Sequence, residues 1–279
     1  MASPGQRDTL LDKPYAERQR IVVADDAVVA AEREAAETAA QTGTGVDWRQ
    51  VARLTMAVSG VGALEAAVEG VSAAAKARTE GLKILTLSRT EAQALTLPPG
   101  HPRDRVVYIG HPALAPVYYP AAGFHRFTFE HKFAEAVRLI MALGATDLEV
   151  QHVRGWSDDF AVNLSAPLPT AVPVEASITA RRRRVTGSSA LFRAKLAGST
   201  EPTLPDELVW FPHEPTWQQV ADGRLKYGLS EFQLAVRYED DYGIDAGFKL
   251  SASKVGLDLG GNFQEHESTT WKISGSFDT

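Results

Sequence analysis

The end of the chain alternates between apolar and polar residues. From Phe232 to Glu239, and again from Thr269 to Phe277, every second residue is apolar or small. The runs Ile244–Ser253 and Val255–Phe263 continue this alternation with a change of phase between them. Because successive side chains of a strand point to opposite faces, the pattern predicts four strands with one buried face each. We therefore expect an antiparallel meander with one of its turns at Tyr238–Gly243.

The first part of the chain has the composition of helices instead. Residues 24–40 are rich in alanine and glutamate and predict one helix, which the TGTG segment at 42–45 interrupts. A second helix is expected from Asp47, because Gln50 three residues later completes a capping-box pattern. The apolar run at 82–88 predicts a strand.

The centre of the chain predicts a helix followed by a strand. Apolar residues recur there at helical spacing, which predicts a single buried stripe. The stripe consists of Phe129, Phe133, Val137, Ile140 and Leu143. Gly144 stands where a left-handed cap would end this helix, and Leu148 and Val150 begin a strand.

The prolines and glycine at 96–105 form the strongest candidate for a domain boundary. We accordingly expect a flexible arm at 1–20, a helical region at 21–95 and an α+β domain at 96–279. The predicted fold class is α+β, with an N-terminal helical portion, a mixed segment and a C-terminal antiparallel β-meander.

Composition limits the chemistry that the chain can carry. The 279 residues suffice for a buried core, and the absence of cysteine excludes disulfides and thiolate sites. The start does not resemble a secretory signal, and no window reaches the ~18 apolar residues of a spanning helix, so we expect a cytoplasmic protein. The net charge is −6, but residues 101–200 hold 12 Lys and Arg against 8 Asp and Glu. This basic middle segment indicates either an anionic partner or an ordinary solvated surface.

The densest positive charge lies in the segment 178–196, which predicts a hairpin. Placing its turn at VTGSS gathers the apolar residues on one face, as register selection requires. The other face then carries Arg181, Arg183, Arg193 and Lys195. Arg181 would stand opposite Arg193, and a bound anion would relieve that repulsion. The alternatives are pairing with the chain's own acidic segment at 239–241 and a merely solvated strand.

Two further groups of residues are candidates for function. His125, Glu130, His131 and His152 could form a metal or acid–base cluster, but their spacing matches no metal signature, and structural hydrogen bonds are the alternative. Trp210, Phe211 and Trp217 could form a partner-binding knob or a loop packed over the sheet. No metal and no cofactor is expected.

The run GFKLSASKVGLDLGGNFQEHESTTWKI resembles the C-terminal hairpin of the small trypsin-co-occurring domains of bacterial conflict systems. The resemblance covers residues 216–277 and rests on a strand, a glycine-centred connection and a closing strand with Thr, a bulky apolar residue and Lys. It implies an adaptor module without catalytic residues, beside proteases and nucleotide-dependent signalling proteins. The chain departs from that family by its additional strands and its large N-terminal portion.

These observations favour a non-enzymatic binding or adaptor protein, in bacterial defence or signalling, that engages a protein partner or anionic ligand through the basic hairpin. One alternative is a membrane-acting protein, pore-forming or lipid-binding, that uses amphipathic hairpins. Another is an enzyme with a histidine-rich central site. Sequence-specific nucleic-acid binding is disfavoured because no recognised motif is present and the net charge is negative. Oligomerisation is left open.

Overall fold

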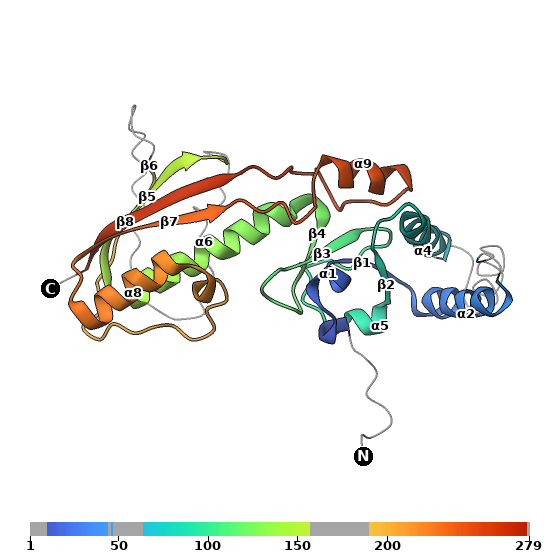
Figure 1. Ribbon diagram of the computed structural model, residues 1–279, viewed down its shortest axis with the longest axis horizontal. Coiled ribbons are helices and arrows are strands. Elements are labelled where there is room, and N and C mark those ends of the chain that lie inside the picture. The colour runs from blue at the N-terminus through green and yellow to red at the C-terminus, as the bar shows by residue number, and fades with distance from the viewer. Residues whose placement is uncertain (1–9, 44–45, 47–63, 157–189, 278–279) are drawn as a thin grey trace, which may run out of the picture. The chain divides into compact units, whose positions relative to one another are not determined.

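The computed structural model describes residues 10–43, 46, 64–156 and 190–277 (Figure 1). These residues form one mixed and one antiparallel sheet together with helices, which confirms the α+β class. The chain divides into two compact units: unit 1 comprises residues 1–127 and 242–265, and unit 2 comprises residues 128–241 and 266–279. The segment 96–105, which we expected to separate domains, therefore lies within unit 1.

Unit 1 contains a four-stranded sheet in the order β2-β1-β3-β4. Its strands are β1 (Arg20–Ala24), β2 (Leu85–Ser88), β3 (Val107–Gly110) and β4 (Tyr118–Pro120). β1 pairs with β2 in parallel and with β3 antiparallel, and β3 pairs antiparallel with β4. Because parallel neighbours need a crossover, the chain between β1 and β2 carries helices.

The helices of unit 1 include the N-terminal one that the sequence predicts. α2 (Asp26–Thr42) begins at the N-cap Asp25 and ends at Gly43, which has a φ of +67°. The second helix expected from Asp47 begins outside the described residues, which resume with α4 (Leu64–Thr79). The short helices are η1 (Leu10–Asp12), α1 (Tyr15–Arg18), α5 (Arg89–Ala92) and η2 (Ala121–Gly123). Residues 10–20 of the expected arm thus contain ordered elements.

The core of unit 1 covers both faces of its sheet. Val22 packs on one side with a cluster that contains Ala77 of α4 and Val107 of β3. Its neighbours Ile21 and Val23 pack on the other side, in a cluster that contains the buried tyrosines of β3 and β4. Burial on both faces explains the continuous apolar run of β1.

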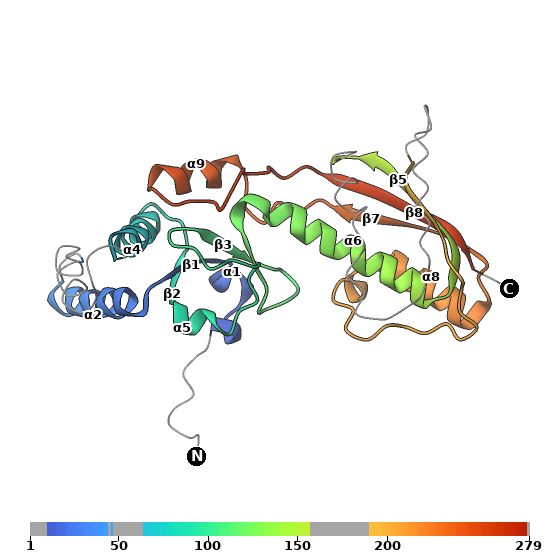
Figure 2. The same ribbon diagram turned by 180° about the vertical axis from the view of Figure 1, so that it is seen from behind.

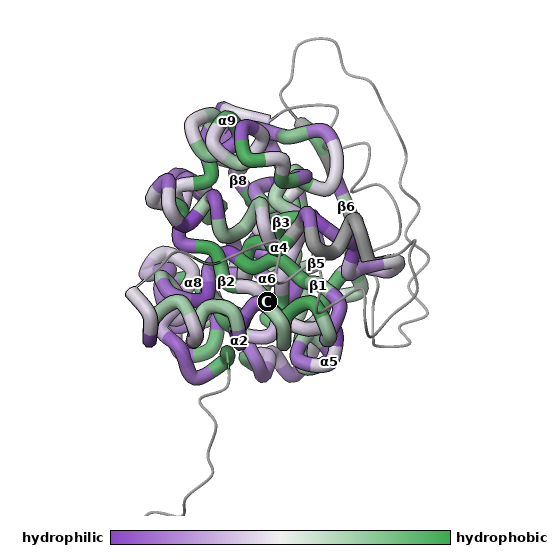
Figure 3. The backbone as a smooth tube through the Cα atoms, turned by 90° about the vertical axis from the view of Figure 1, so that its right-hand side faces the viewer, coloured by the Kyte–Doolittle hydropathy of each residue, from purple (hydrophilic) through white to green (hydrophobic). Residues whose placement is uncertain are grey.

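The prediction of strands at 244–253 and 255–263 is wrong. The first run is a helix, α9 (Ala246–Lys254), in which the side chain of Asp245 caps the backbone N–H of Phe248 at 2.8 Å. Phe248 and Ala252 are buried four residues apart, whereas Leu250 is 72% exposed. Figure 3 shows hydrophobic and hydrophilic positions mixed along α9. The run is short enough for its apolar residues to fit both periods, and the aspartate cap favours the helix.

The second run forms no strand either, but it completes unit 1. Asp258 makes an isolated parallel bridge with Val106, and the backbone N–H of Ala122 donates to Leu259 O at 2.7 Å. Leu257 and Leu259 are buried in the same core cluster as Phe248. We call residues 242–265 the returning segment, because they lie between two strands of unit 2 and fold into unit 1.

Side chains of unit 1 hold the entry of the returning segment through three consecutive carbonyls. Gln19 Nε2 donates to Tyr242 O at 2.7 Å, and Arg20 donates to Gly243 O at 3.0 Å. His125 Nε2 lies 2.7 Å from Ile244 O; because a carbonyl only accepts, this nitrogen carries the proton. These bonds replace the strand pairing that the carbonyls lack.

Unit 2 contains an antiparallel sheet in the order β6-β5-β8-β7. Its strands are β5 (Ala145–Arg154), β6 (Ala190–Lys195), β7 (Glu231–Tyr238) and β8 (Thr269–Phe277). β7 and β8 confirm the first and the last of the four terminal strands that the sequence predicts. They pair directly, from Glu231 opposite Ser276 to Tyr238 opposite Thr269.

Two helices, α6 (Phe124–Ala142) and α8 (Pro215–Tyr227), cover one face of this sheet, as Figures 1 and 2 show from opposite sides. The chain boundary between the units falls within α6. The predicted apolar stripe of α6 is buried throughout, and Trp271 of β8 packs edge-on against Phe129 and Phe133. The short helix η3 (Phe211–His213) precedes α8. Among the described helices, none combines the length and the apolar character that a membrane span needs.

Replacing Gly275 of β8 by alanine should destabilise the protein. A Cβ at this position would lie 1.9 Å from Asp147 O and 2.9 Å from a ring carbon of Phe232, so a strand would have to move. Such overpacking typically costs about 1–3 kcal/mol, which urea unfolding would report as a lower midpoint. Ser274→Ala, on the polar face of the same strand, is the matched control and should change stability by less than about 0.5 kcal/mol. Equal midpoints for the two variants would contradict this packing.

Candidate functional site

The face of the unit 2 sheet that points away from α6 and α8 is polar. Alternating burial along β7 and β8 defines which positions belong to it. Its paired positions on the central and edge strands β5, β7 and β8 are Asp147, Glu149, Gln151, Arg154, Glu231, Gln233, Ala235, Arg237, Thr270, Lys272, Ser274 and Ser276, and β6 adds Arg193 and Lys195. We call this set the open face. None of these side chains is aromatic.

At one end of the open face, cations and carboxylates are already paired. Arg193 Nε lies 2.7 Å from Glu149 Oε2, and Lys195 Nζ lies 3.9 Å from Asp147 Oδ1. A hydrogen bond from Gln151, together with the ion pair to Arg193, holds the pKa of Glu149 below its usual range. The carboxylates of β5 therefore neutralise these two cations of β6.

The other end of the open face holds two cations that pair with none of the described carboxylates. Lys272 stands opposite Ala235, and Arg237 stands opposite Thr270, so the two cations are diagonal neighbours on adjacent strands. Within the part of the chain that the structure describes, neither forms an ion pair with a carboxylate. Arg154 lies on the other side of Thr270 and donates to its hydroxyl at 3.2 Å. We call Arg154, Arg237 and Lys272 the basic end.

A described carboxylate compensates part of the basic end. A nitrogen of Arg154 lies 2.5 Å from Glu239 Oε1, at the end of β7. Glu239 belongs to the acidic segment that the sequence offered as an internal partner for the basic hairpin. It pairs with Arg154 of β5, and the described arginine of the hairpin, Arg193, pairs with Glu149.

The predicted hairpin is only partly covered by the structure. Arg181 and Arg183 lie outside the described residues. Arg193 and Lys195 share one face, as expected, and the strand that lies beside them in the structure is β5. Sequence reasoning missed Arg237 and Lys272, although the phase of the two predicted terminal strands already places both on a polar face.

The outer edge of β7 is closed by side chains of two helices. Trp217 Nε1 of α8 donates to Ala235 O at 3.1 Å, and Lys132 Nζ of α6 donates to Arg237 O at 2.8 Å. These bonds occupy carbonyls that an added strand would need. Trp217 is fully buried, so the structure places this aromatic candidate in the interior.

A buried carboxylate fixes the other aromatic candidates. Glu135 of α6 accepts hydrogen bonds from the backbone N–H groups of Val209, Trp210 and Phe211 at 2.8–2.9 Å. Trp210 is 8% exposed, and its indole N–H donates to His131 Nδ1 at 2.9 Å. Because an indole only donates, His131 Nδ1 carries no proton, and burial lowers the pKa of this histidine.

The histidines of the predicted metal cluster have separate structural contacts. His125, in unit 1, donates to Ile244 O. In unit 2, His131 accepts from Trp210, and His152 Nε2 lies 2.8 Å from Gly155 O. Across residues 10–43, 46, 64–156 and 190–277, no group of three or more His, Cys, Asp or Glu side chains is placed to hold a metal ion. Glu130 thus belongs to no such group.

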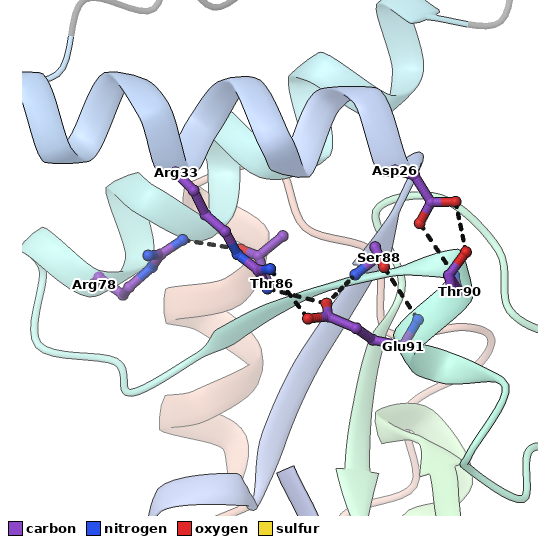
Figure 4. Close-up of polar contacts among 7 residues, drawn as sticks. All are labelled: Asp26, Arg33, Arg78, Thr86, Ser88, Thr90 and Glu91. Atoms are coloured by element: carbon purple, nitrogen blue, oxygen red, sulfur yellow. Dashed lines mark hydrogen bonds and ion pairs between the residues drawn. The ribbon is translucent and has the colours of Figure 1, made fainter. Parts of the chain in front are cut away.

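A second candidate lies in unit 1, at the carboxyl ends of the parallel strands β1 and β2, where open α/β sheets usually bind ligands (Figure 4). Asp26, after β1, accepts from the backbone N–H of Thr90 at 3.1 Å and from its hydroxyl at 2.9 Å. Ser88 and Glu91 form a reciprocal capping box at the start of α5. The bonds of Asp26 therefore join the start of α2 to α5, which directly follows β2.

Arginines complete this network. Arg33 of α2 donates two hydrogen bonds of 3.0 Å to the carboxylate of Glu91. Arg78 of α4 donates to Thr86 at 2.9 Å and to Glu32 at 2.6 Å (Figure 4 shows the contact with Thr86). The carboxylates of this network are hydrogen-bonded to groups of the chain itself, so the network ties helices to the sheet. The open face is therefore the better candidate for a binding site.

This network should make the protein sensitive to acid. Hydrogen bonds from Ser88 and Thr90 lower the pKa of Asp26. Partial burial alone would raise the pKa of Glu91, but the bonds from Arg33 and from the Ser88 N–H outweigh it and lower that pKa as well. Carboxylates with depressed pKa values stabilise the fold above their unfolded pKa, and this contribution is lost as the pH falls through the folded pKa.

We therefore expect the loss of stability between about pH 5 and about pH 3 to be smaller in Asp26→Asn than in the wild type. The variant lacks one carboxylate whose protonation destabilises the folded state. Urea midpoints at several pH values measure this. Asp206→Asn, at an exposed carboxylate, is the matched control and should keep the wild-type slope. Identical slopes for all three proteins would show that the network has no such role.

The comparisons with known proteins add no relative. No family model matches the chain, and neither the curated proteins nor the solved structures contain a significant match.

Proposed function

We propose that this chain is a non-enzymatic binding protein that engages an anionic partner through the open face of its unit 2 sheet. The observation that carries the proposal is the pair Lys272 and Arg237. They are diagonal neighbours on adjacent strands, and neither is neutralised by a described carboxylate. The hydroxyl of Thr270 lies beside both.

The two cations repel each other only weakly, and a bound anion would attract both. Two unit charges about 8 Å apart in water repel each other by only ~0.5 kcal/mol, so the sheet tolerates the pair without a ligand. An anion placed between them would accept charge-assisted hydrogen bonds from both, and the planar fork of an arginine suits carboxylate and phosphate oxygens. Arg193 and Lys195 contribute less, because an incoming anion would have to displace Glu149 and Asp147.

The alternatives have less support in the geometry. The membrane-acting hypothesis depended on amphipathic hairpins, and two of their strands are replaced by α9 and by irregular chain. The enzyme hypothesis depended on a histidine cluster whose described members bond to separate parts of the chain. The adaptor role in bacterial defence or signalling rests on the resemblance to trypsin-co-occurring domains, of which the closing strand is present as β8, whereas the first strand is the helix α9. The cytoplasmic location belongs to the same proposal, and the cysteine-free composition is compatible with it.

Binding of soluble polyanions tests the proposal. The probes are poly-L-glutamate, polyphosphate and a mixed-sequence single-stranded RNA. We expect at least one to bind the wild type, with an affinity that weakens about tenfold or more from low to moderate salt. The variant Lys272→Ala plus Arg237→Ala should lose about tenfold in affinity, because the ion pairs with the probe disappear.

The control removes the same charge elsewhere. Lys226→Ala plus Lys254→Ala replaces two exposed lysines outside the open face and should leave the affinity within about twofold. Equal losses in both double variants would mean that only net charge matters. That result, or no binding of any probe, would refute the proposal.

A further inference from the structure

We infer that the anionic partner is an acidic polypeptide in an extended conformation, docked by its side chains on the open face. The inference rests on the proposed function, since it names the chemistry of the partner for the same surface. Three features of the face support it: the absence of aromatic groups, the order of the charges and the spacing of the rows.

The first feature is that the face lacks stacking platforms. Proteins that bind single-stranded nucleic acid on a sheet stack its bases on aromatic side chains, which supply much of the affinity. The open face offers cations, carboxylates, amides and hydroxyls, but no aromatic ring at any of its paired positions. A nucleic acid would therefore gain only its phosphate contacts there.

The second feature is the order of charges along the central strand. The row of Thr270 contains Arg154 and Arg237, and the next row contains Lys272 with the neutral Gln151 and Ala235. Two rows further, Ser276 stands between Asp147 and Glu231. Because Lys195 stands opposite Asp147, this row carries one net negative charge. A nucleic-acid backbone is negative at every step and would gain no attraction at this second end. A polypeptide can be acidic over the basic end and basic or neutral beyond it.

The third feature is spacing. Rows on one face of a strand are two residues apart, or about 6.6–6.8 Å. Alternate side chains of an extended peptide have the same spacing, so acidic residues at i and i+2 would match the rows of Arg237 and Lys272. Trp217 and Lys132 close the outer edge of β7, so the peptide cannot pair there as an added strand. It would instead lie on the open face, run along the strands and bind through its side chains.

Fluorescence anisotropy with short labelled peptides tests this. A peptide of alternating Glu and Thr should bind the full chain at least about tenfold more tightly than a single-stranded RNA of equal charge, and a Lys–Thr peptide should not bind. Reversing the protein's charge, with Lys272→Glu plus Arg237→Glu, should abolish binding of the Glu–Thr peptide and create binding of the Lys–Thr peptide. Circular dichroism and urea midpoints check that the variant is folded.

Each outcome separates the two proposals. RNA or polyphosphate binding that depends on Lys272 and Arg237, with no peptide binding, would overturn this inference and leave the proposed function intact. No anion binding at all would overturn both. A concentration-dependent dimer in sedimentation, broken by the same charge reversal, would assign the face to a second copy of this chain and overturn the inference as well.

Discussion

The pairing of β8 with both β5 and β7 is the interaction on which the rest of unit 2 depends. β8 is the last of the described strands and yet lies in the middle of its sheet, so the sheet is complete only when residues 269–277 are in place. On one side it buries Trp271, Ile273 and Phe277 under the helices; on the other it presents Thr270, Lys272 and two serines. The glycine at 275 is the only kind of residue that leaves room for the β5 backbone there. The strand that completes the core therefore also contributes the central residues of the open face.

A second constraint recurs in both units: backbone groups that lack a strand or helix partner are satisfied by side chains. Glu135 accepts three successive N–H groups, and Gln19, Arg20 and His125 bond three successive carbonyls. A buried polar group without a partner costs about 1–3 kcal/mol, so these side chains stabilise the fold by bonding such groups. This explains why several histidines and tryptophans that could carry chemistry have internal hydrogen bonds instead.

The basic end of the open face differs from these satisfied groups because two of its cations lack a described carboxylate partner. Several other charged side chains of the described residues have an ion-pair partner, such as Arg193 with Glu149 and Arg33 with Glu91. Lys272 and Arg237 are diagonal neighbours on a polar sheet face, and neither pairs with a described carboxylate. An external anion gains most at these two cations, because it need not displace a described carboxylate there.

The sequence by itself determined the elements with a long or well-marked pattern. The stripe from Phe129 to Leu143 predicted α6, and the alternation of β7 and β8 predicted both strands and the faces they bury, because each pattern reports burial of one side of a local element. Only the tertiary structure decided that residues 246–254 are a helix, that the returning segment belongs to unit 1, and that Glu149 stands beside Arg193. A nine-residue run fits two periods, and strand partners are chosen by contacts between distant parts of the chain, which no local pattern records.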